Sequence, residues 1–326
     1  MRTVGRVIVA GLLILATCGR VEAQQNAANG ELGVYQVRPN FYMIAGAGAN
    51  IAVQIGEDGV VLVDAGSSSM ASKVLETIQK LTPRPIRYII DTSAEADHVG
   101  GNASLSKAGQ NLNILNGAGG PNPGTAAPIL STEEVLNRMS APTGKQGAFP
   151  SDGWPTETFF TPERTMYFND DGIELLRQPG AHSDGDVFVL FRRADVVMAG
   201  DIIDTDHFPV IDIEKGGGVQ GEIAALNRLI RLAIPPTPLV WKGGGTRVIP
   251  GHGFICDQAD IVEYRDMVVI IRDIIQDLIK QGKTLDQIKE ANPTEAYRPR
   301  YGADSGPWTT DQFVESIYKS LVRRAP

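Results

Sequence analysis

The chain has little cysteine, because Cys18 and Cys256 are the only two in 326 residues. Cys18 lies in an amino-terminal segment that has the pattern of a removable leader. Cys256 alone would then remain in the mature chain, which excludes an intramolecular disulfide. We expect Cys256 to be a small core residue and not a nucleophile.

The apolar run at residues 7–16 is too short to cross a membrane. It follows Arg2 and Arg6 and precedes Val21-Glu22-Ala23, which has the small residues of a cleavage signal, so residues 1–23 have the pattern of a secretory signal peptide. An alternative is that Cys18 is a lipoprotein acceptor, although Thr17 is larger than the residue usually found before such a cysteine. We expect a periplasmic or secreted protein with no stable membrane insertion.

Positive charge is in deficit, with 30 Lys and Arg against 38 Asp and Glu. Loss of the leader removes three arginines and one glutamate and takes the formal net charge from -8 to -10. Such an acidic surface argues against nucleic acid and anionic membranes as partners. The partner that we expect is a small-molecule substrate. By size alone, a mature chain of about 300 residues could form one domain or two.

Histidine is scarce, and the chain holds only His98, His182, His207 and His252. The first of them follows the apolar, β-branched run at residues 86–91, which predicts a buried strand. The loop after this strand offers Glu95, Asp97 and His98 within four residues, and all three are good ligands for a divalent metal. Taken alone, the loop is equally an ordinary acidic loop that opens a helix, with Asp97 as a cap and His98 in solvent.

Three distant segments carry further ligand-type residues at the ends of expected strands. His182 lies in a glycine-punctuated turn before a strand, Asp201 follows Gly200 at the end of another, and His252 lies between two glycines after a third. Each motif is weak by itself. Four strand ends in this order form a pattern of real specificity for a metal site.

The order of these motifs resembles the metallo-beta-lactamase superfamily from about Tyr35 to the last helix. Residues 60–66, with Asp64, are similar to the family's first acidic strand end, and residues 93–98 stand where the family has H-x-H-x-D-H. The pair Gly200-Asp201 resembles the glyoxalase II and lactonase branch, in which an aspartate bridges two metals. The resemblance implies that His182, Asp201 and His252 are metal ligands.

The resemblance breaks at two positions, because the first two histidines of the motif are Ser93 and Glu95 here. Carried over residue by residue, the second metal site is complete, and it consists of Asp97, His98, Asp201 and His252. The first site keeps Glu95, His182 and Asp201, since Ser93 is too weakly basic to be a dependable ligand. The resemblance implies one or two divalent ions, with Zn²⁺ expected and with Mn²⁺ or Fe²⁺ favoured at the carboxylate-containing first site, which could equally be empty.

Three residues, Asp64, Ser93 and His207, are expected beside the ligands and not among them. The resemblance places Asp64 where it would orient a ligand imidazole. His207 follows the bridging Asp201 and could touch substrate, or it could be a surface histidine. Among the ligands, Asp97 is the residue we expect to act on the nucleophile.

Alternating and helical patterns fill the rest of the chain. Strands are predicted at residues 41–45, 50–55, 60–64, 87–91, 165–168, 173–178, 187–192 and 196–199, and helices at residues 70–81, 132–139, 219–232, 257–280 and 310–322. Strands followed by helices, twice, predict an α/β (α+β) fold with two facing sheets and helices outside. This is the four-layered αβ/βα sandwich of the resembled family, which favours a single domain over residues 24–326.

Several loops are rich in glycine and proline. Residues 116–124 and 141–155 could frame a substrate with Phe149, Trp154 and Phe159 as an apolar wall, or these aromatic side chains could pack inward. Residues 216–218 are three glycines before a helix, which could cradle an anion but are favoured as a turn.

These observations predict an exported, metal-dependent hydrolase that uses metal-activated water on an ester, lactone, thioester or lactam. Because Ser93 and Glu95 replace two histidines, the alternative is a catalytically attenuated protein on the same fold that binds a metal or a ligand. A redox role with iron is a third option, since Glu95 would suit iron.

Overall fold

The computed structural model describes residues 31–111, 126–141, 147–236 and 244–323. The expected leader at residues 1–23 and the glycine-rich loop at residues 116–124 lie outside the described residues. Part of the loop at residues 141–155 lies outside them as well.

The first half of the chain forms a seven-stranded sheet whose strands lie in sequence order. The first four strands are an antiparallel meander, and the last four pair in parallel. The strands are β1 (Gly33–Arg38), β2 (Phe41–Ala45), β3 (Ile51–Gly56), β4 (Gly59–Val63), β5 (Ile86–Ile90), β6 (Ile129–Thr132) and β7 (Glu157–Phe159). Every residue of β4 is buried, as expected for a strand covered on both faces.

The second half forms a five-stranded sheet in the order β12-β11-β10-β9-β8. Its strands are antiparallel except for β11 and β12, which pair in parallel. The strands are β8 (Glu163–Phe168), β9 (Asp171–Arg177), β10 (Val187–Phe191), β11 (Val196–Asp204) and β12 (Arg247–His252). A parallel pair needs a crossover, and helix α6 supplies it here.

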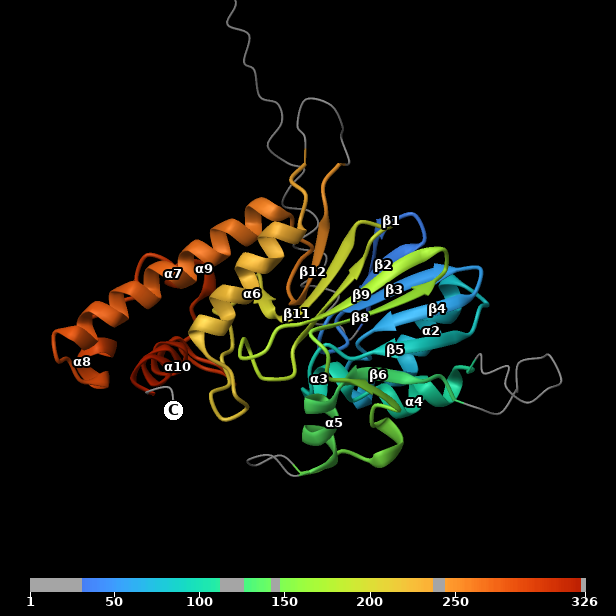
Figure 1. Cartoon of the computed structure of the whole chain (residues 1–326), viewed down its shortest axis with the longest axis horizontal. Coiled ribbons are helices and arrows are strands. Elements are labelled where there is room, and N and C mark those ends of the chain that lie inside the picture. Colours follow the sequence, from blue (N-terminus) through green and yellow to red (C-terminus); the bar gives the residue numbers. More distant parts are fainter. Residues whose placement is uncertain (1–30, 112–125, 142–146, 237–243, 324–326) are drawn as a thin grey trace, which may run out of the picture.

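Helices cover the outer face of each sheet (Figure 1). Against the first sheet lie α2 (Ala71–Leu81) and α4 (Asn102–Ala108), with the short α3 (Ala96–Val99) and α5 (Glu133–Ser140) at its edge. Against the second lie α6 (Val219–Leu232), α7 (Gln258–Lys280) and α10 (Thr310–Val322). Two short helices, α8 (Leu285–Glu290) and α9 (Arg298–Tyr301), connect the last two long ones, and two 3-10 turns, η1 (Ser68–Met70) and η2 (Ser151–Gly153), complete the described elements. The predicted four-layered αβ/βα sandwich is confirmed.

Three apolar cores hold these layers together. The central core lies between the two sheets, where the rings of Phe41 and Phe191 meet edge to face with centroids 4.8 Å apart. A second core joins the first sheet to α2 and α4, and the third joins the second sheet to α6, α7 and α10. Cys256 is 2% exposed in this third core, as predicted, and burial raises the pKa of its thiol.

Parallel strands of both sheets end at one shared rim. In the first sheet Val63 at the end of β4 pairs with Ile90 at the end of β5, and in the second Asp204 at the end of β11 pairs with His252 at the end of β12. The amide of Val187 donates to the carbonyl of Thr92 at 3.0 Å, which joins the two sheets at this rim. The residues that follow these strand ends are therefore brought together.

The sequence pattern located the long helices well and missed short elements. The strand predicted at residues 196–199 continues as β11 to Asp204, so Asp201 lies inside this strand and not after it. The helices at residues 219–232 and 310–322 have the predicted bounds, α2 and α7 begin one residue later than predicted, and α5 is shifted by one residue at both ends. Strands β1, β6 and β7 and helix α4 were not predicted. Strands β6 and β7 have four and three residues, too few for an alternating pattern to show.

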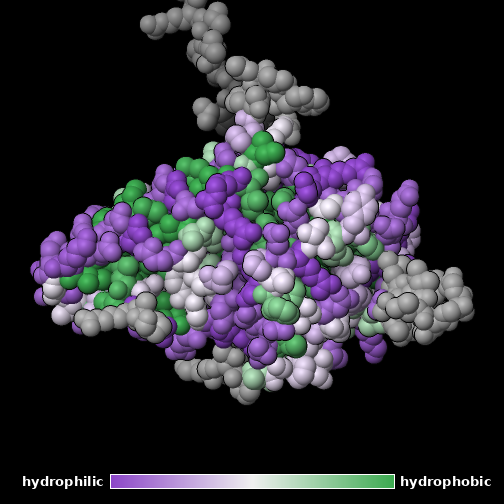
Figure 2. All heavy atoms as spheres, in the orientation of Figure 1, coloured by the Kyte–Doolittle hydropathy of each residue, from purple (hydrophilic) through white to green (hydrophobic). Residues whose placement is uncertain are grey.

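The outer surface has both hydrophilic and hydrophobic areas. Hydrophilic residues cover most of the face in Figure 2, with hydrophobic patches over the helical side that contains α6 and α7. Two of the exposed apolar side chains, Ile270 and Ile274, lie on α7. In the part of the chain that the structure describes, no helix has both the length and the apolar composition needed to cross a bilayer.

Candidate metal centre

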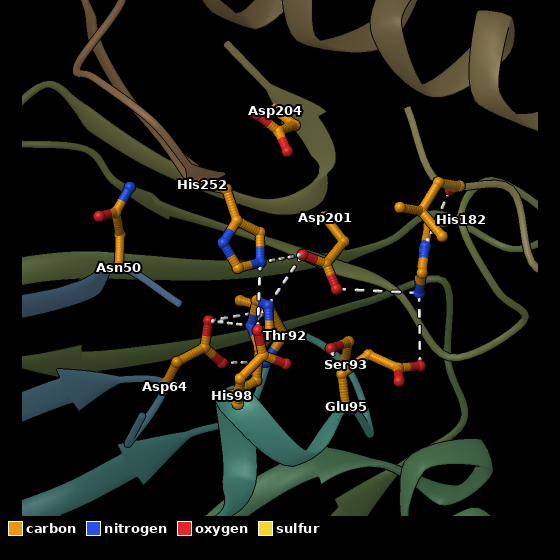
Figure 3. Close-up of polar contacts among 12 residues, drawn as sticks. Asn50, Asp64, Thr92, Ser93, Glu95, His98, His182, Asp201, Asp204 and His252 are labelled. Atoms are coloured by element: carbon orange, nitrogen blue, oxygen red, sulfur yellow. Dashed lines mark hydrogen bonds and ion pairs between the residues drawn. The ribbon is translucent and has the colours of Figure 1, made fainter. Parts of the chain in front are cut away.

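The shared rim gathers the candidate ligands from both sheets (Figure 3). The loop after β5 supplies Glu95, and α3 directly after it supplies Asp97 and His98. From the second sheet, β11 supplies Asp201 and the end of β12 supplies His252. His182 comes from the turn between β9 and β10. Residues up to 157 positions apart thus converge on one edge of the sandwich.

Asp97, His98 and His252 form a compact group whose ligand atoms all lie within 4.8 Å of one another. Nε2 of His252 is 3.3 Å from Oδ2 of Asp97, and the His98 and His252 rings meet edge to face. Two imidazole nitrogens and one carboxylate oxygen form a donor set that suits Zn²⁺. The residues present therefore fit a divalent metal at this position.

His98 is held by a fully buried carboxylate. Its Nδ1 lies 2.9 Å from Oδ2 of Asp64, and neither side chain is exposed. Asp64 has a positive φ of 65° and also accepts hydrogen bonds from the amide and the hydroxyl of Thr92, both at 2.8 Å. Because Nδ1 of His98 donates to this carboxylate, Nε2 is the nitrogen left to bind a metal in the compact group.

Asp201 lies between the two halves of the rim. Its Oδ1 is 2.8 Å from Nε2 of His98 and 3.5 Å from Nε2 of His252, while its Oδ2 is 3.8 Å from Nε2 of His182. The residue before it, Gly200, has a φ of 57°, which favours glycine. A Cβ at Gly251 would lie 2.6 Å from Oδ1 of Asp201, so only glycine leaves room for this carboxylate.

A buried amide ties the two ligand-bearing segments together. The side chain of Asn50, which is 4% exposed, donates to the carbonyls of Pro250 and Gly253 at 3.0 and 3.1 Å. The amide of the neighbouring Ala49 donates to the carbonyl of Asp97 at 3.1 Å. The turn between β2 and β3 therefore contacts both α3 and the end of β12, on either side of His252.

The other half of the rim contains Glu95 and His182. Nδ1 of His182 donates to the carbonyl of Val210 at 2.9 Å, and its Nε2 lies 3.4 Å from Oε1 of Glu95. The ammonium of Lys215 donates to the same Oε1 at 2.6 Å. Ser93 is buried, and its hydroxyl accepts from the amide of Glu95 at 3.4 Å.

Charge pairing shifts the pKa of these groups. Burial raises the pKa of the Glu95 carboxyl, but His182 and Lys215 together hold it at about 2. Burial lowers the pKa of the His182 and His252 imidazoles, but hydrogen bonds to carboxylates raise both values to about 10. The carboxylate is that of Glu95 for His182, and those of Asp201 and Asp97 for His252. A metal must therefore displace a proton from His252 in order to bind.

The remaining sequence candidate, His207, pairs with Asp204. The ring of His207 is half exposed, with Nδ1 3.1 Å from Oδ2 of Asp204.

His98 is fully buried and not in solvent, and Glu95, not Asp97, is the residue before α3 begins. The acidic-loop alternative therefore does not describe this segment.

The described parts of the loops beside the rim are packed and hydrogen-bonded. Phe159 is buried in the core between the sheets, and Phe149 and Trp154 pack on a small cluster beneath the loop that contains Ala94. The amides of residues 216–218 donate to carbonyls within their own turn and to Ala181. The inward-packed alternative for the aromatic side chains and the turn alternative for the glycines are thus the observed ones.

Three contributors were missed by the sequence analysis, namely Asn50, Thr92 and Lys215. Lys215 is separated from Glu95 by 120 positions, and Asn50 from Pro250 by 200. Local patterns contain no signal for such pairs. Thr92 directly follows the predicted strand at residues 86–91 and opens the loop that carries the candidate ligands. This position was the only feature of the sequence that could have indicated a role for Thr92 at the rim.

Comparison with known proteins agrees with this architecture. The family model described as the metallo-beta-lactamase superfamily matches residues 45–252, which include Asp64 and every candidate ligand from Glu95 to His252. No curated protein matches the chain.

Solved structures share the fold at low sequence identity. A double mutant of the sec-alkyl sulfatase PisA1 has a TM-score of 0.65 and 13% identity, covering 92% of this chain and 52% of its own. The stereoselective inverting sec-alkylsulfatase Pisa1 from Pseudomonas sp. has a TM-score of 0.61 and 14% identity, with the same coverage. A metallo-beta-lactamase from Pontibacter korlensis has a TM-score of 0.55 and 16% identity, covering 73% of this chain and 99% of its own. The chain spans about half the length of the sulfatase structures, and at these identities the likeness shows the fold alone.

Proposed function

The chain belongs to the metallo-beta-lactamase superfamily, and from this membership we propose that it is a metal-dependent hydrolase whose metal is bound by Asp97, His98 and His252. The observation that carries the proposal is the grouping of these three ligand atoms within 4.8 Å at the shared rim. Their mixed nitrogen and oxygen donors make Zn²⁺ the proposed ion. A bound divalent ion would polarise a substrate carbonyl and lower the pKa of a coordinated water.

The chain's own residues would orient this chemistry. Asp64 fixes the His98 ring so that Nε2 faces the group. The side chain of Asp97 is 40% exposed and that of His252 is 36% exposed, so this side of the group is open to a small molecule. Burial raises the pKa of Asp97, but its contact with His252 and the charge of His98 lower it, which keeps the carboxylate charged and able to orient a water.

The proposed substrates are small molecules with an ester, lactone, thioester or lactam centre. Sulfate esters belong in the same test, because two of the similar structures are named as sulfatases. The leader pattern at residues 1–23 supports export, which we propose to the periplasm or beyond.

The test combines metal analysis with hydrolysis of a substrate panel. Protein purified without chelators is analysed by plasma mass spectrometry and then assayed on esters, lactones, thioesters, lactams and alkyl sulfates. His252→Ala should lose the metal and lower the rate by roughly 100-fold or more, whereas Lys80→Ala, on the exposed face of α2, should change neither. Equal rates in wild type and His252→Ala would refute the proposal.

A second candidate is a catalytically attenuated metal- or ligand-binding protein on the same fold. Ser93 and the Glu95–Lys215 ion pair favour it, because the first half of the rim lacks two imidazoles. A chain that holds its metal and hydrolyses nothing on the panel would support this candidate. Iron found in place of zinc would instead direct attention to redox chemistry.

A further inference from the structure

The ammonium of Lys215 is built into the half of the rim that contains Glu95 and His182. Its Nζ lies 2.6 Å from Oε1 of Glu95 and 3.4 Å from Oδ2 of Asp212. The side chain of Lys215 is only 14% exposed. A cation thus already occupies this half of the rim, within a cluster of carboxylates.

Several contacts fix the backbone that carries this lysine. The guanidinium of Arg138 binds both carboxylate oxygens of Asp184 and also donates to the carbonyl of Lys215 at 2.7 Å. The amide of Asp184 donates to that carbonyl at 3.0 Å, and the amide of Lys215 donates to Oδ1 of Asp212 at 3.0 Å. The amide of Asp212 in turn donates to the carbonyl of His182. The lysine is therefore held in place relative to His182, unlike a freely rotating surface side chain.

The same carboxylate oxygen faces both the lysine and the imidazole. Oε1 of Glu95 is 3.4 Å from Nε2 of His182 and 2.6 Å from Nζ of Lys215. A metal bound to Oε1 at about 2 Å could lie no farther than about 4.6 Å from the ammonium. Two cations at that separation repel one another strongly in a partly buried site.

The ligand geometry of the two halves differs accordingly. Among the described residues, the only group of three or more His, Cys, Asp or Glu ligand atoms within 4.8 Å is Asp97, His98 and His252. Glu95, His182 and Asp201 form no such group. Ser93, which follows the β5 strand end in the same loop, contacts the Glu95 amide instead.

We infer that the Lys215 ammonium takes the place of a second metal ion, so that the chain binds one divalent ion, at Asp97, His98 and His252, and uses Lys215 to neutralise Glu95. The inference rests on the proposed function, because it presupposes a metal bound by Asp97, His98 and His252. It replaces the expectation that Glu95, His182 and Asp201 form an additional metal site. Lys215 then keeps a fixed positive charge beside Glu95, where a second ion would otherwise supply it.

Metal stoichiometry tests the inference without relying on activity. The metal-free protein is titrated with Co²⁺, following its visible absorption, and Zn²⁺ content is measured by plasma mass spectrometry after dialysis. Wild type should saturate at about one equivalent. Lys215→Met, which keeps the length and removes the charge, should gain a second equivalent of lower affinity at Glu95, His182 and Asp201.

Two variants serve as controls, and a pair of triple variants covers a folding failure. Lys215→Arg keeps the positive charge and should stay at one equivalent. Lys280→Met removes a lysine from the exposed end of α7 and should also stay at one. If thermal unfolding shows that Lys215→Met does not fold, two triple variants replace it. Both carry Ser93→His and Glu95→His, and they differ in carrying either Lys215→Arg or Lys215→Met. The variant with Lys215→Arg keeps a positive charge beside the rebuilt imidazoles and should bind its second metal equivalent at least roughly tenfold more weakly than the variant with Lys215→Met.

The outcomes separate this inference from the proposed function. Two tight equivalents in wild type would overturn the inference and leave the hydrolase proposal intact. One equivalent in both wild type and folded Lys215→Met would also overturn it, because the lysine would then not be what excludes the second ion. No metal in wild type, even with excess Co²⁺ or Zn²⁺, would instead refute the proposed function itself.

Discussion

Asp64 and His98 face each other across 2.9 Å in a site from which solvent is excluded. The two residues lie at the ends of neighbouring structural elements, β4 and α3, and are 34 positions apart. Burial lowers the pKa of the His98 imidazole, but the charges of Asp201 and Asp64 raise it well above its usual range. The carboxylate of Asp64 thus sets which ring nitrogen of His98 carries a proton when a metal takes Nε2.

Asp64→Asn should therefore weaken metal binding more than it weakens the fold. The asparagine can still accept from Thr92, but its amide would donate to Nδ1 of His98 and so shift the ring proton to Nε2. We expect metal affinity to fall roughly 10- to 100-fold, as is typical when a partner of a ligand histidine is changed. Competition with a chromophoric chelator measures this loss.

The alanine variant provides the contrast. Asp64→Ala leaves the Thr92 amide without its buried acceptor, which should destabilise the fold by about 1–3 kcal/mol in addition to weakening metal binding. Unfolding by urea with a chelator present would show this difference between the variants. Wild-type metal affinity in Asp64→Asn would mean that the carboxylate does not set the His98 tautomer.

The fold and the compact ligand group were within reach of the sequence because parallel strands end together. Once residues 60–64, 86–91 and 196–199 are read as buried strands, Asp64, the Asp97-His98 pair and Asp201 must lie near the ends of their sheets. That the two sheets share one rim came from the family resemblance and not from periodicity. The structure then places His252 against Asp97.

The lysine could not be predicted in this way. Lys215 lies in a turn directly before three glycines, and the sequence analysis considered only those glycines, as a turn or an anion cradle. Its approach to Glu95 depends on Arg138 and Asp184, which bring a turn of the second sheet against α5. Such tertiary pairs leave no period or motif in the chain.

Gly251→Ala should displace Asp201. The added methyl carbon would lie 2.6 Å from Oδ1 of Asp201 and 2.8 Å from the carbonyl carbon of Gly200. Because backbone surrounds it, the contact is relieved only by moving the carboxylate or the strand end. We expect a loss of stability of about 1–3 kcal/mol, together with weaker metal binding.

Gly147→Ala is the matched control, since a Cβ there meets nothing within 4 Å. Thermal unfolding and Co²⁺ titration of both variants compare the two positions directly. Unchanged stability and affinity in Gly251→Ala would show that the rim has more room than the structure describes.

The metal-free protein should lose stability as the pH rises from about 6.5 to 10. Burial lowers the pKa of the His252 imidazole, but hydrogen bonds to Asp201 and Asp97 raise it from 6.5 to about 10. A group whose pKa is raised by folding stabilises the folded state fully below its unfolded pKa, and this contribution disappears as the pH passes through the folded value. Urea unfolding in the presence of a chelator, at a series of pH values, measures the slope.

His182 behaves in the same way, and Glu95 has the opposite sign. The folded pKa of Glu95 is about 2, lowered from 4.5, so its contribution is present above 4.5 and is lost as the pH falls towards 2. These groups together place maximum stability between about pH 4.5 and 6.5. His252→Ala should flatten the alkaline slope, and an unchanged slope in this variant would show that His252 keeps its ordinary pKa.

Asn50→Ala and Asn50→Asp should affect the site in a defined order. The amide of Asn50 donates to the carbonyls of Pro250 and Gly253, on either side of His252. Alanine leaves both carbonyls without this donor, whereas aspartate keeps the shape but presents oxygen atoms to two carbonyl oxygens. We expect a destabilisation of about 1–3 kcal/mol for alanine and a larger one for aspartate.

Metal affinity should follow the same order, because the amide fixes the segment that carries His252 while touching no metal ligand side chain itself. Titration with Co²⁺ in wild type, Asn50→Ala and Asn50→Asp would reveal this. If the two variants lost stability equally and kept wild-type affinity, then Asn50 would support the fold without positioning His252. A graded loss of affinity would instead mean that His252 depends on the turn between β2 and β3, so that the metal centre is held together from the first sheet as well as from the second.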